Sequence, residues 1–120
     1  MAIQRNIVRI PALVDLHVHF REPGFSYKET IASGSMAAAA SGYSAVFTMP
    51  NLNPVPDTIA HLQEQLDIIK RDTYTGVYPF ASITMGQKGT GELVAFEALA
   101  PYVKGLSDDG RGTQDETLMR

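Results

Sequence analysis

Segments typical of strands alternate with segments typical of helices along the whole chain. Four short apolar runs, bounded by turn-forming residues, lie at 10–19, 43–49, 77–83 and 102–106. They recur at intervals of about 25 to 35 residues, which is typical of a parallel sheet built from βαβ units. The sequence therefore predicts an α/β fold, either a small doubly wound domain or part of a (β/α)8 barrel of the TIM type.

A helical pattern occupies each interval between these runs. The first begins at a capping box of the S-x-x-E form, from Ser26 to Glu29. Asp57 can cap the second helix. The third is predicted over residues 91–100, where Pro101 closes it.

Residues 1–120 contain no linker or low-complexity segment and are interpreted as a single domain. A complete (β/α)8 barrel needs about 250 residues, so this chain supplies about four βα units, an N-terminal half. Half a barrel exposes two strand edges and an apolar inner face. We therefore expect a homo-oligomer, or pairing with the missing half of the barrel.

The composition excludes several classes of protein and of site. Ten lysine and arginine residues against 13 aspartate and glutamate residues give a net charge of −3, which offers no electrostatic case for nucleic acid or an anionic membrane. The chain has no cysteine, so any metal must be bound by imidazole and carboxylate. Because there is neither a membrane-length apolar run nor a signal-peptide pattern, we expect a cytoplasmic protein.

Polar residues gather where the predicted strands end. His17, His19 and Arg21 follow the first apolar run, Asn51 follows the second, and Asp108 with Asp109 follow the fourth. In both candidate architectures ligands bind beyond the carboxyl ends of the strands. These residues therefore mark the predicted site.

The two histidines fit a metal ion. Alternate residues of a strand project to the same side, so His17 and His19 point together while Val18 points into the packing. Two neutral imidazoles so placed can share a zinc ion, and Asp15 could orient one of them. The alternative is a pair of half-buried histidines that bond backbone carbonyls.

The other polar residues each have a functional and an ordinary interpretation. The guanidinium of Arg21 suits a substrate carboxylate, and Asn51 could donate its amide to the same group. Otherwise Arg21 is a surface residue and Asn51 a turn residue. Asp108 and Asp109 could supply a carboxylate that bridges two metal ions, or form a surface turn.

Three motifs together make the sequence similar to the dihydroorotases, a family of the amidohydrolase superfamily. They are HVHFREPG at 17–24, MPN at 49–51 and SDDG at 107–110. The resemblance implies a (β/α)8 barrel that holds one or two zinc ions at its mouth. It also implies a metal-dependent hydrolase that interconverts N-carbamoyl-L-aspartate and L-dihydroorotate, a step in the biosynthesis of the pyrimidine nucleotide UMP.

Carried over residue by residue, the resemblance makes His17 and His19 ligands of the more buried zinc. Asp109 would be the carboxylate near or between the metals, where many relatives use a carboxylated lysine. Asp109 is preferred to Asp108 because its distance along the chain from His19 fits the family pattern.

The resemblance also implies that Arg21 and Asn51 hold the substrate carboxylate. Two further histidines and the aspartate that acts as general acid and base belong to later strands, beyond Arg120. We therefore interpret the chain as a fragment that has little activity alone.

Two other functions remain open. An allantoinase or hydantoinase would use the same histidines but favour a lysine in place of Asp109. A non-catalytic interaction module similar to dihydroorotase would keep the fold and lose the reaction.

Overall fold

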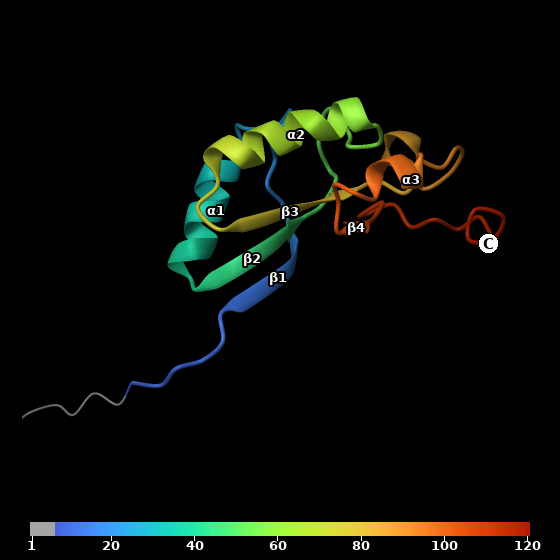
Figure 1. Cartoon of the computed structure of the whole chain (residues 1–120). Coiled ribbons are helices and arrows are strands. Elements are labelled where there is room, and N and C mark those ends of the chain that lie inside the picture. Colours follow the sequence, from blue (N-terminus) through green and yellow to red (C-terminus); the bar gives the residue numbers. More distant parts are fainter. Residues whose placement is uncertain (1–6) are drawn as a thin grey trace, which may run out of the picture.

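The computed structural model describes residues 7–120 as a four-stranded sheet with helices between the strands (Figure 1). In chain order the elements are β1 (Leu13–Val18), α1 (Ile31–Ala40), β2 (Tyr43–Thr48), α2 (Ile59–Asp72), β3 (Gly76–Ala81), the 3-10 turn η1 (Met85–Gln87), α3 (Phe96–Leu99) and β4 (Gly105–Leu106). The strands pair in their sequence order, and every pair is parallel. The predicted fold class is confirmed: the chain is α/β, with a curled parallel sheet like the first units of a (β/α)8 barrel.

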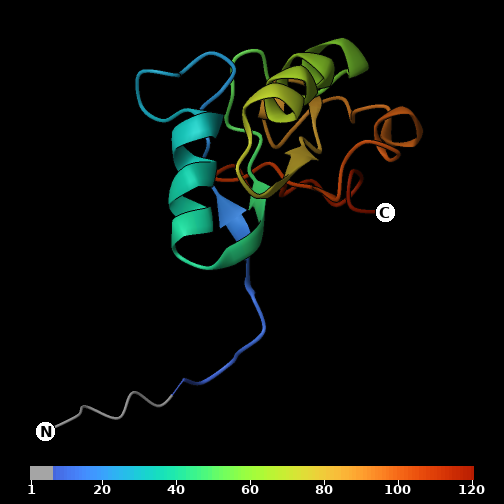
Figure 2. The same cartoon turned by 60° about the vertical axis from the view of Figure 1, so that its left-hand side comes forward.

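The helices α1 and α2 cover one face of the sheet, and no helix covers the other face in the part of the chain that the structure describes (Figures 1 and 2). On that open face the ring of Phe47 lies 5.3 Å from the ring of Tyr78 and 6.0 Å from that of Phe80, between centroids. Tyr78 is 38% exposed. The oligomer or missing half that we expect to cover this face stays a prediction.

The core under α1 brings the sheet and the end of β1 together. Phe20, Ile31, Val46 and Val77 are buried against one another. Gly34 of α1 allows this packing, because a Cβ at that position would lie 2.3 Å from the ring of Phe20. The helix can approach the chain after β1 closely only because residue 34 has no side chain.

A second core packs α2 and α3 against the end of β3. It consists of Leu62, Ala81, Val94 and Leu99. A buried hydrogen bond joins α2 to the sheet, since the Nε2 of Gln65 donates to the Oγ1 of Thr48 at 3.1 Å. Thr48 is the last residue of β2, so this bond fixes α2 close to the carboxyl end of the sheet.

Two of the predicted helix caps are wrong by a few residues. The first helix is capped by Thr30, which forms a capping box with Ser33, and not by the pair Ser26 and Glu29. Thr58, not Asp57, caps α2 through a bond from the backbone N–H of His61 to its Oγ1. Neighbouring polar side chains compete for the same free N–H groups at the start of a helix, so spacing in the sequence alone does not identify the cap.

The third helix and the fourth strand are shorter than predicted. Residues 91–95 do not join α3, because Thr84 and Leu93 form an isolated antiparallel bridge and the N–H of Val94 bonds the carbonyl of Ile83. Only two residues of the predicted 102–106 strand are regular.

None of the helices in residues 7–120 combines the length and apolar character needed to cross a membrane.

We predict that Gly34→Ala destabilises the chain by about 1–3 kcal/mol, because the added methyl group overpacks the core against Phe20. Thermal unfolding followed by circular dichroism measures the change. A Phe20→Leu substitution in the same chain should restore part of the loss, since leucine leaves room for the methyl group. An unchanged midpoint in Gly34→Ala would contradict the packing described.

Candidate metal centre

The end of β1 presents two imidazoles on the same side of the chain. His17 and His19 alternate with Val18 and Phe20, and these two pack in the core. The N–H of Met49, directly after β2, donates to the carbonyl of Val18 at 3.0 Å and holds the end of β1 in place. The histidine rings meet edge to face with their centroids 5.1 Å apart.

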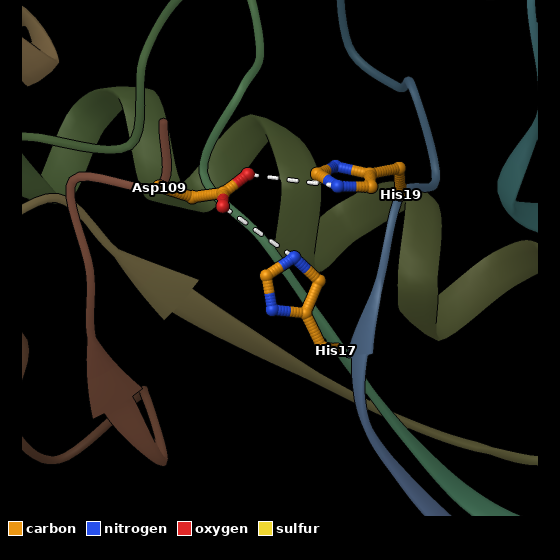
Figure 3. Close-up of side chains that lie close together, drawn as sticks. All are labelled: His17, His19 and Asp109. Carbon is orange, nitrogen blue, oxygen red and sulfur yellow. Dashed lines mark ion pairs between the residues drawn. The ribbon is translucent and has the colours of Figure 1, made fainter. Parts of the chain in front are cut away.

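The carboxylate of Asp109 completes a three-residue cluster with these rings. Asp109 follows β4, the last strand of the sheet, and the curl of the sheet brings it across to β1 (Figure 3). One carboxylate oxygen lies 3.5 Å from the Nε2 of His17, and the other lies 3.5 Å from the Nε2 of His19. One nitrogen or oxygen of each residue lies within 4.8 Å of the corresponding atoms of the other two.

These separations fit a shared ion better than they fit hydrogen bonds. An N–H···O bond has its heavy atoms about 2.7–3.2 Å apart, which is shorter than the observed 3.5 Å. Ligand atoms at 2.0–2.2 Å from a tetrahedral zinc ion lie about 3.3–3.6 Å from one another. The two 3.5 Å contacts match this spacing but use different oxygens of Asp109, and one ligand atom from each of the three residues lies within 4.8 Å of the others, so the side chains would draw together slightly around an ion. Two imidazole nitrogens and one carboxylate oxygen are also a donor set that zinc accepts. The three side chains therefore fit a metal ion, and they remain partly exposed to solvent.

The two neighbouring aspartates have different surroundings. Asp108 is buried, and its carboxylate accepts bonds from the N–H groups of Ile83 and Thr84 and, at 2.6 Å, from the hydroxyl of Thr84. These bonds tie the turn after β4 to the chain after β3. The carboxylate of Asp109 faces the histidines instead, so the structure brings Asp109, and not Asp108, into the cluster.

Two side-chain amides hold the backbone of Asp109. The Nδ2 of Asn51 and the Nε2 of Gln87 each donate to its carbonyl oxygen at 3.1 Å. Gln87 has a φ of +55°, the only positive value at a non-glycine residue in the described part of the chain. The sequence reasoning missed Gln87, because a glutamine inside GQKG carries no signal of a contact with a residue 22 positions later.

The structure gives Asp15 and Asp57 partners other than the expected ones. Asp15 does not orient an imidazole: its carboxylate accepts the backbone N–H of His17 at 3.0 Å. Asp57 does not cap α2, as described above, but binds the ring of His61 at 2.7 Å and the N–H of Gly86 at 2.8 Å. His61 lies outside the three-residue cluster.

The surroundings of His19 favour its neutral form. Burial lowers the pKa of His19 below its ordinary value of 6.5, and the positive charge of Arg21 lowers it further, while the charge of Asp109 opposes the shift. A neutral imidazole is the form that binds a metal. His19 therefore stays available as a ligand to a lower pH than an isolated histidine would.

Both residues predicted to bind a carboxylate line an open cavity of about 490 Å³, whereas His17, His19 and Asp109 do not line it. Arg21 reaches it from the segment after β1, and Asn51 reaches it from the segment after β2. One amide hydrogen of Asn51 is already used by Asp109, and its Oδ1 is buried without a hydrogen-bond partner. The structure thus brings Arg21 and Asn51 to one cavity, and Asn51 links it to the backbone of Asp109.

Comparison with known proteins places the sequence of this chain in a family. A family model described as Dihydro-orotase-like matches residues 6–120. The chain belongs to this family. The resemblance seen in the three motifs is therefore confirmed, and the match extends well beyond them.

Curated members of the dihydroorotase family match at high identity. A protein named Dihydroorotase from Fusobacterium nucleatum is 50% identical over 106 residues, which cover 88% of this chain and 25% of the relative. Dihydroorotases from Staphylococcus epidermidis and Enterococcus faecalis are 49% and 47% identical, with 91% of this chain and 26% of each relative covered. The chain thus spans about a quarter of the length of these relatives.

We predict that Arg21→Gln raises the pKa of His19 toward 6.5, because the charge that disfavours its protonation is removed. Burial also lowers this pKa, so the return should be partial. The ring proton signals of the histidines, followed by NMR against pH, measure it. The matched control is Arg120→Gln, which removes an equal charge far along the chain. An equal shift in both variants would contradict a local effect of Arg21.

Proposed function

We propose that this chain forms the metal-binding part of a dihydroorotase. The reaction is the zinc-dependent interconversion of N-carbamoyl-L-aspartate and L-dihydroorotate in pyrimidine biosynthesis. The observation that carries the proposal is the convergence of His17, His19 and Asp109 at the carboxyl end of a parallel sheet. Membership of the dihydroorotase-like family supplies the reaction class, a hydrolysis of a cyclic amide.

The cluster residues would hold zinc, two from the end of β1 and one from the turn after β4. When bound, zinc supplies a Lewis acid that polarises the amide carbonyl of the substrate. His17 and His19 would contribute neutral nitrogen donors from the end of one strand, and the carboxylate of Asp109 would offset half of the charge of the ion. Asn51 and Gln87 fix the main chain of Asp109, so the carboxylate needs little reorganisation to serve as a ligand.

The residues of the cavity would orient the substrate. The guanidinium of Arg21 can bind a carboxylate with two parallel hydrogen bonds, which fixes both position and rotation of the ring. The second amide hydrogen of Asn51 is available for the same carboxylate. Neither residue would take part in the bond changes. Both would orient the substrate, and such positioning lowers the barrier because the freedom of motion is already lost on binding.

A related amidase acting on allantoin or hydantoin is the second candidate. It rests on the histidine pair, which such enzymes would share. The carboxylate of Asp109 between the imidazoles and the names of the relatives favour dihydroorotase.

Zinc affinity should depend on the three cluster residues. We expect His17→Ala, His19→Ala and Asp109→Asn each to weaken binding by about tenfold or more, because each removes one of three protein ligands. Competition with a chromophoric chelator measures the affinity. The matched controls are His61→Ala and Asp115→Asn, which remove the same kinds of group outside the cluster. Equal losses in the controls would contradict the assignment.

The reaction class can be tested in a chimeric enzyme. Because the Fusobacterium nucleatum dihydroorotase is 50% identical over 106 residues, its matching segment can be replaced by that of this chain. We expect the chimera to consume dihydroorotate, followed by the ultraviolet absorbance of the ring, and Asp109→Asn to abolish this turnover.

Two outcomes would count against the proposal. A folded, zinc-loaded chimera that acts on allantoin or hydantoin in preference to dihydroorotate would support the second candidate. A folded chimera with no turnover of any cyclic amide would indicate a module without catalysis.

A further inference from the structure

The side-chain amide of Asn51 has a defined orientation at the candidate metal centre. Its Nδ2 donates to the carbonyl oxygen of Asp109 at 3.1 Å. A backbone carbonyl can only accept, so the nitrogen of the amide must face Asp109 and the oxygen must face another group. That oxygen, Oδ1, is buried, and no donor reaches hydrogen-bond geometry with it. A buried acceptor left unpaired is costly, so a donor is expected beside it.

The ring of His19 carries a matching atom. Its Nε2 faces the carboxylate of Asp109, whereas its Nδ1 is buried and also lacks a partner at hydrogen-bond geometry (Figure 3). Burial and the charge of Arg21 lower the pKa of His19, while the charge of Asp109 and hydrogen bonding with the side chain of Asn51 raise it. Only an acceptor favours the protonated ring, so the oxygen of Asn51 is the atom that faces His19.

The other imidazole of the cluster does not need such a partner. The side chain of His17 is 55% exposed, compared with 35% for His19. Water can therefore accept a hydrogen bond from the Nδ1 of His17. Of the two candidate nitrogen ligands, His19 is the one whose outer nitrogen is buried and depends on a protein group.

We propose that Asn51 is a positioning residue of the metal centre: its Oδ1 accepts the Nδ1–H of His19 while its Nδ2 holds the carbonyl of Asp109. This inference rests on the proposed metal binding and deepens it. A metal-binding histidine keeps its proton on the nitrogen away from the ion, and an acceptor there fixes both the tautomer and the plane of the ring. One amide thus orients a ligand from β1 and the backbone of a ligand from the turn after β4. Its second amide hydrogen remains for the substrate carboxylate.

A role in substrate binding alone makes different predictions. Asn51 would then have no effect on the zinc affinity or on the proton of His19 when substrate is absent. Without zinc, the neutral ring of His19 lies between two acceptors, the carboxylate of Asp109 on Nε2 and the amide oxygen of Asn51 on Nδ1. Either a bound zinc ion or removal of the carboxylate leaves Asn51 as the group that determines where the proton resides.

The first measurement is NMR on the 15N-labelled 120-residue chain loaded with zinc, without substrate and above neutral pH. We expect the Nδ1–H of His19 to exchange slowly with water and that of His17 to exchange fast. Asn51→Leu, which keeps a similar shape and removes both polar atoms, should bring the exchange of His19 to the rate of His17. It should also weaken zinc binding by roughly tenfold, measured with a chromophoric chelator. The matched control is Asn53→Leu, the same substitution at an exposed asparagine, which should change neither quantity.

The second measurement needs no zinc. Asp109→Ala removes the competing carboxylate but keeps the backbone carbonyl that Asn51 binds. In this variant the nitrogen shifts of neutral His19 should place its proton on Nδ1, and adding Asn51→Leu should abolish that preference.

Four results would each overturn the proposal: equally fast exchange at both histidines, unchanged zinc affinity in Asn51→Leu, an equal loss of affinity in Asn53→Leu, or a proton on Nε2 of His19 in zinc-free Asp109→Ala. If Asn51→Leu fails to fold, the exchange rates of the unsubstituted chain and the tautomer in Asp109→Ala decide, because neither requires that variant. A chain that binds no zinc would count against the proposed function, while the zinc-free tautomer would still test the role of Asn51.

Discussion

The buried carboxylate of Asp108 is the contact on which the geometry of the candidate site depends. It accepts two backbone N–H groups and one hydroxyl from the segment after β3, and it does so from the turn after β4. The strand β4 itself has only two residues and contributes little pairing. Charge-assisted bonds of this kind are stronger than neutral ones, and a buried carboxylate left without them would be costly. The position of Asp109 opposite the histidines is therefore set by its neighbour in sequence.

The fold and the cluster could be predicted from sequence for the same reason. Parallel strands place their carboxyl ends at one edge, so polar residues that follow strands must meet there even when they are far apart in the chain. His17, His19 and Asp109 obey this rule, and their approach follows from topology more than from any local detail. Arg21 and Asn51 reach the same cavity for the same reason.

Local competitions between polar groups were less predictable. Asp57 and Thr58 are both good helix caps by residue type, but the carboxylate of Asp57 instead binds the ring of His61 and accepts the N–H of Gly86. Residues 91–95 have helical character, but a bridge to Thr84 holds the chain extended at Leu93. Gly86 lies 29 residues after Asp57, and Thr84 belongs to the segment after β3, so spacing along the chain does not reveal these two partners.

Residues 17–21 serve the core and the site at once. Phe20 is packed under α1 against Gly34, while its neighbours His19 and Arg21 face the metal centre and the cavity. A deletion of one residue here would exchange the two sides, so that an imidazole would enter the core and an apolar side chain would face the ligand. The tolerance of this segment to evolutionary change is accordingly narrow. The apolar residues of this segment cannot be changed independently of its ligand-binding residues. We expect members of this family to show no insertion or deletion within residues 17–21.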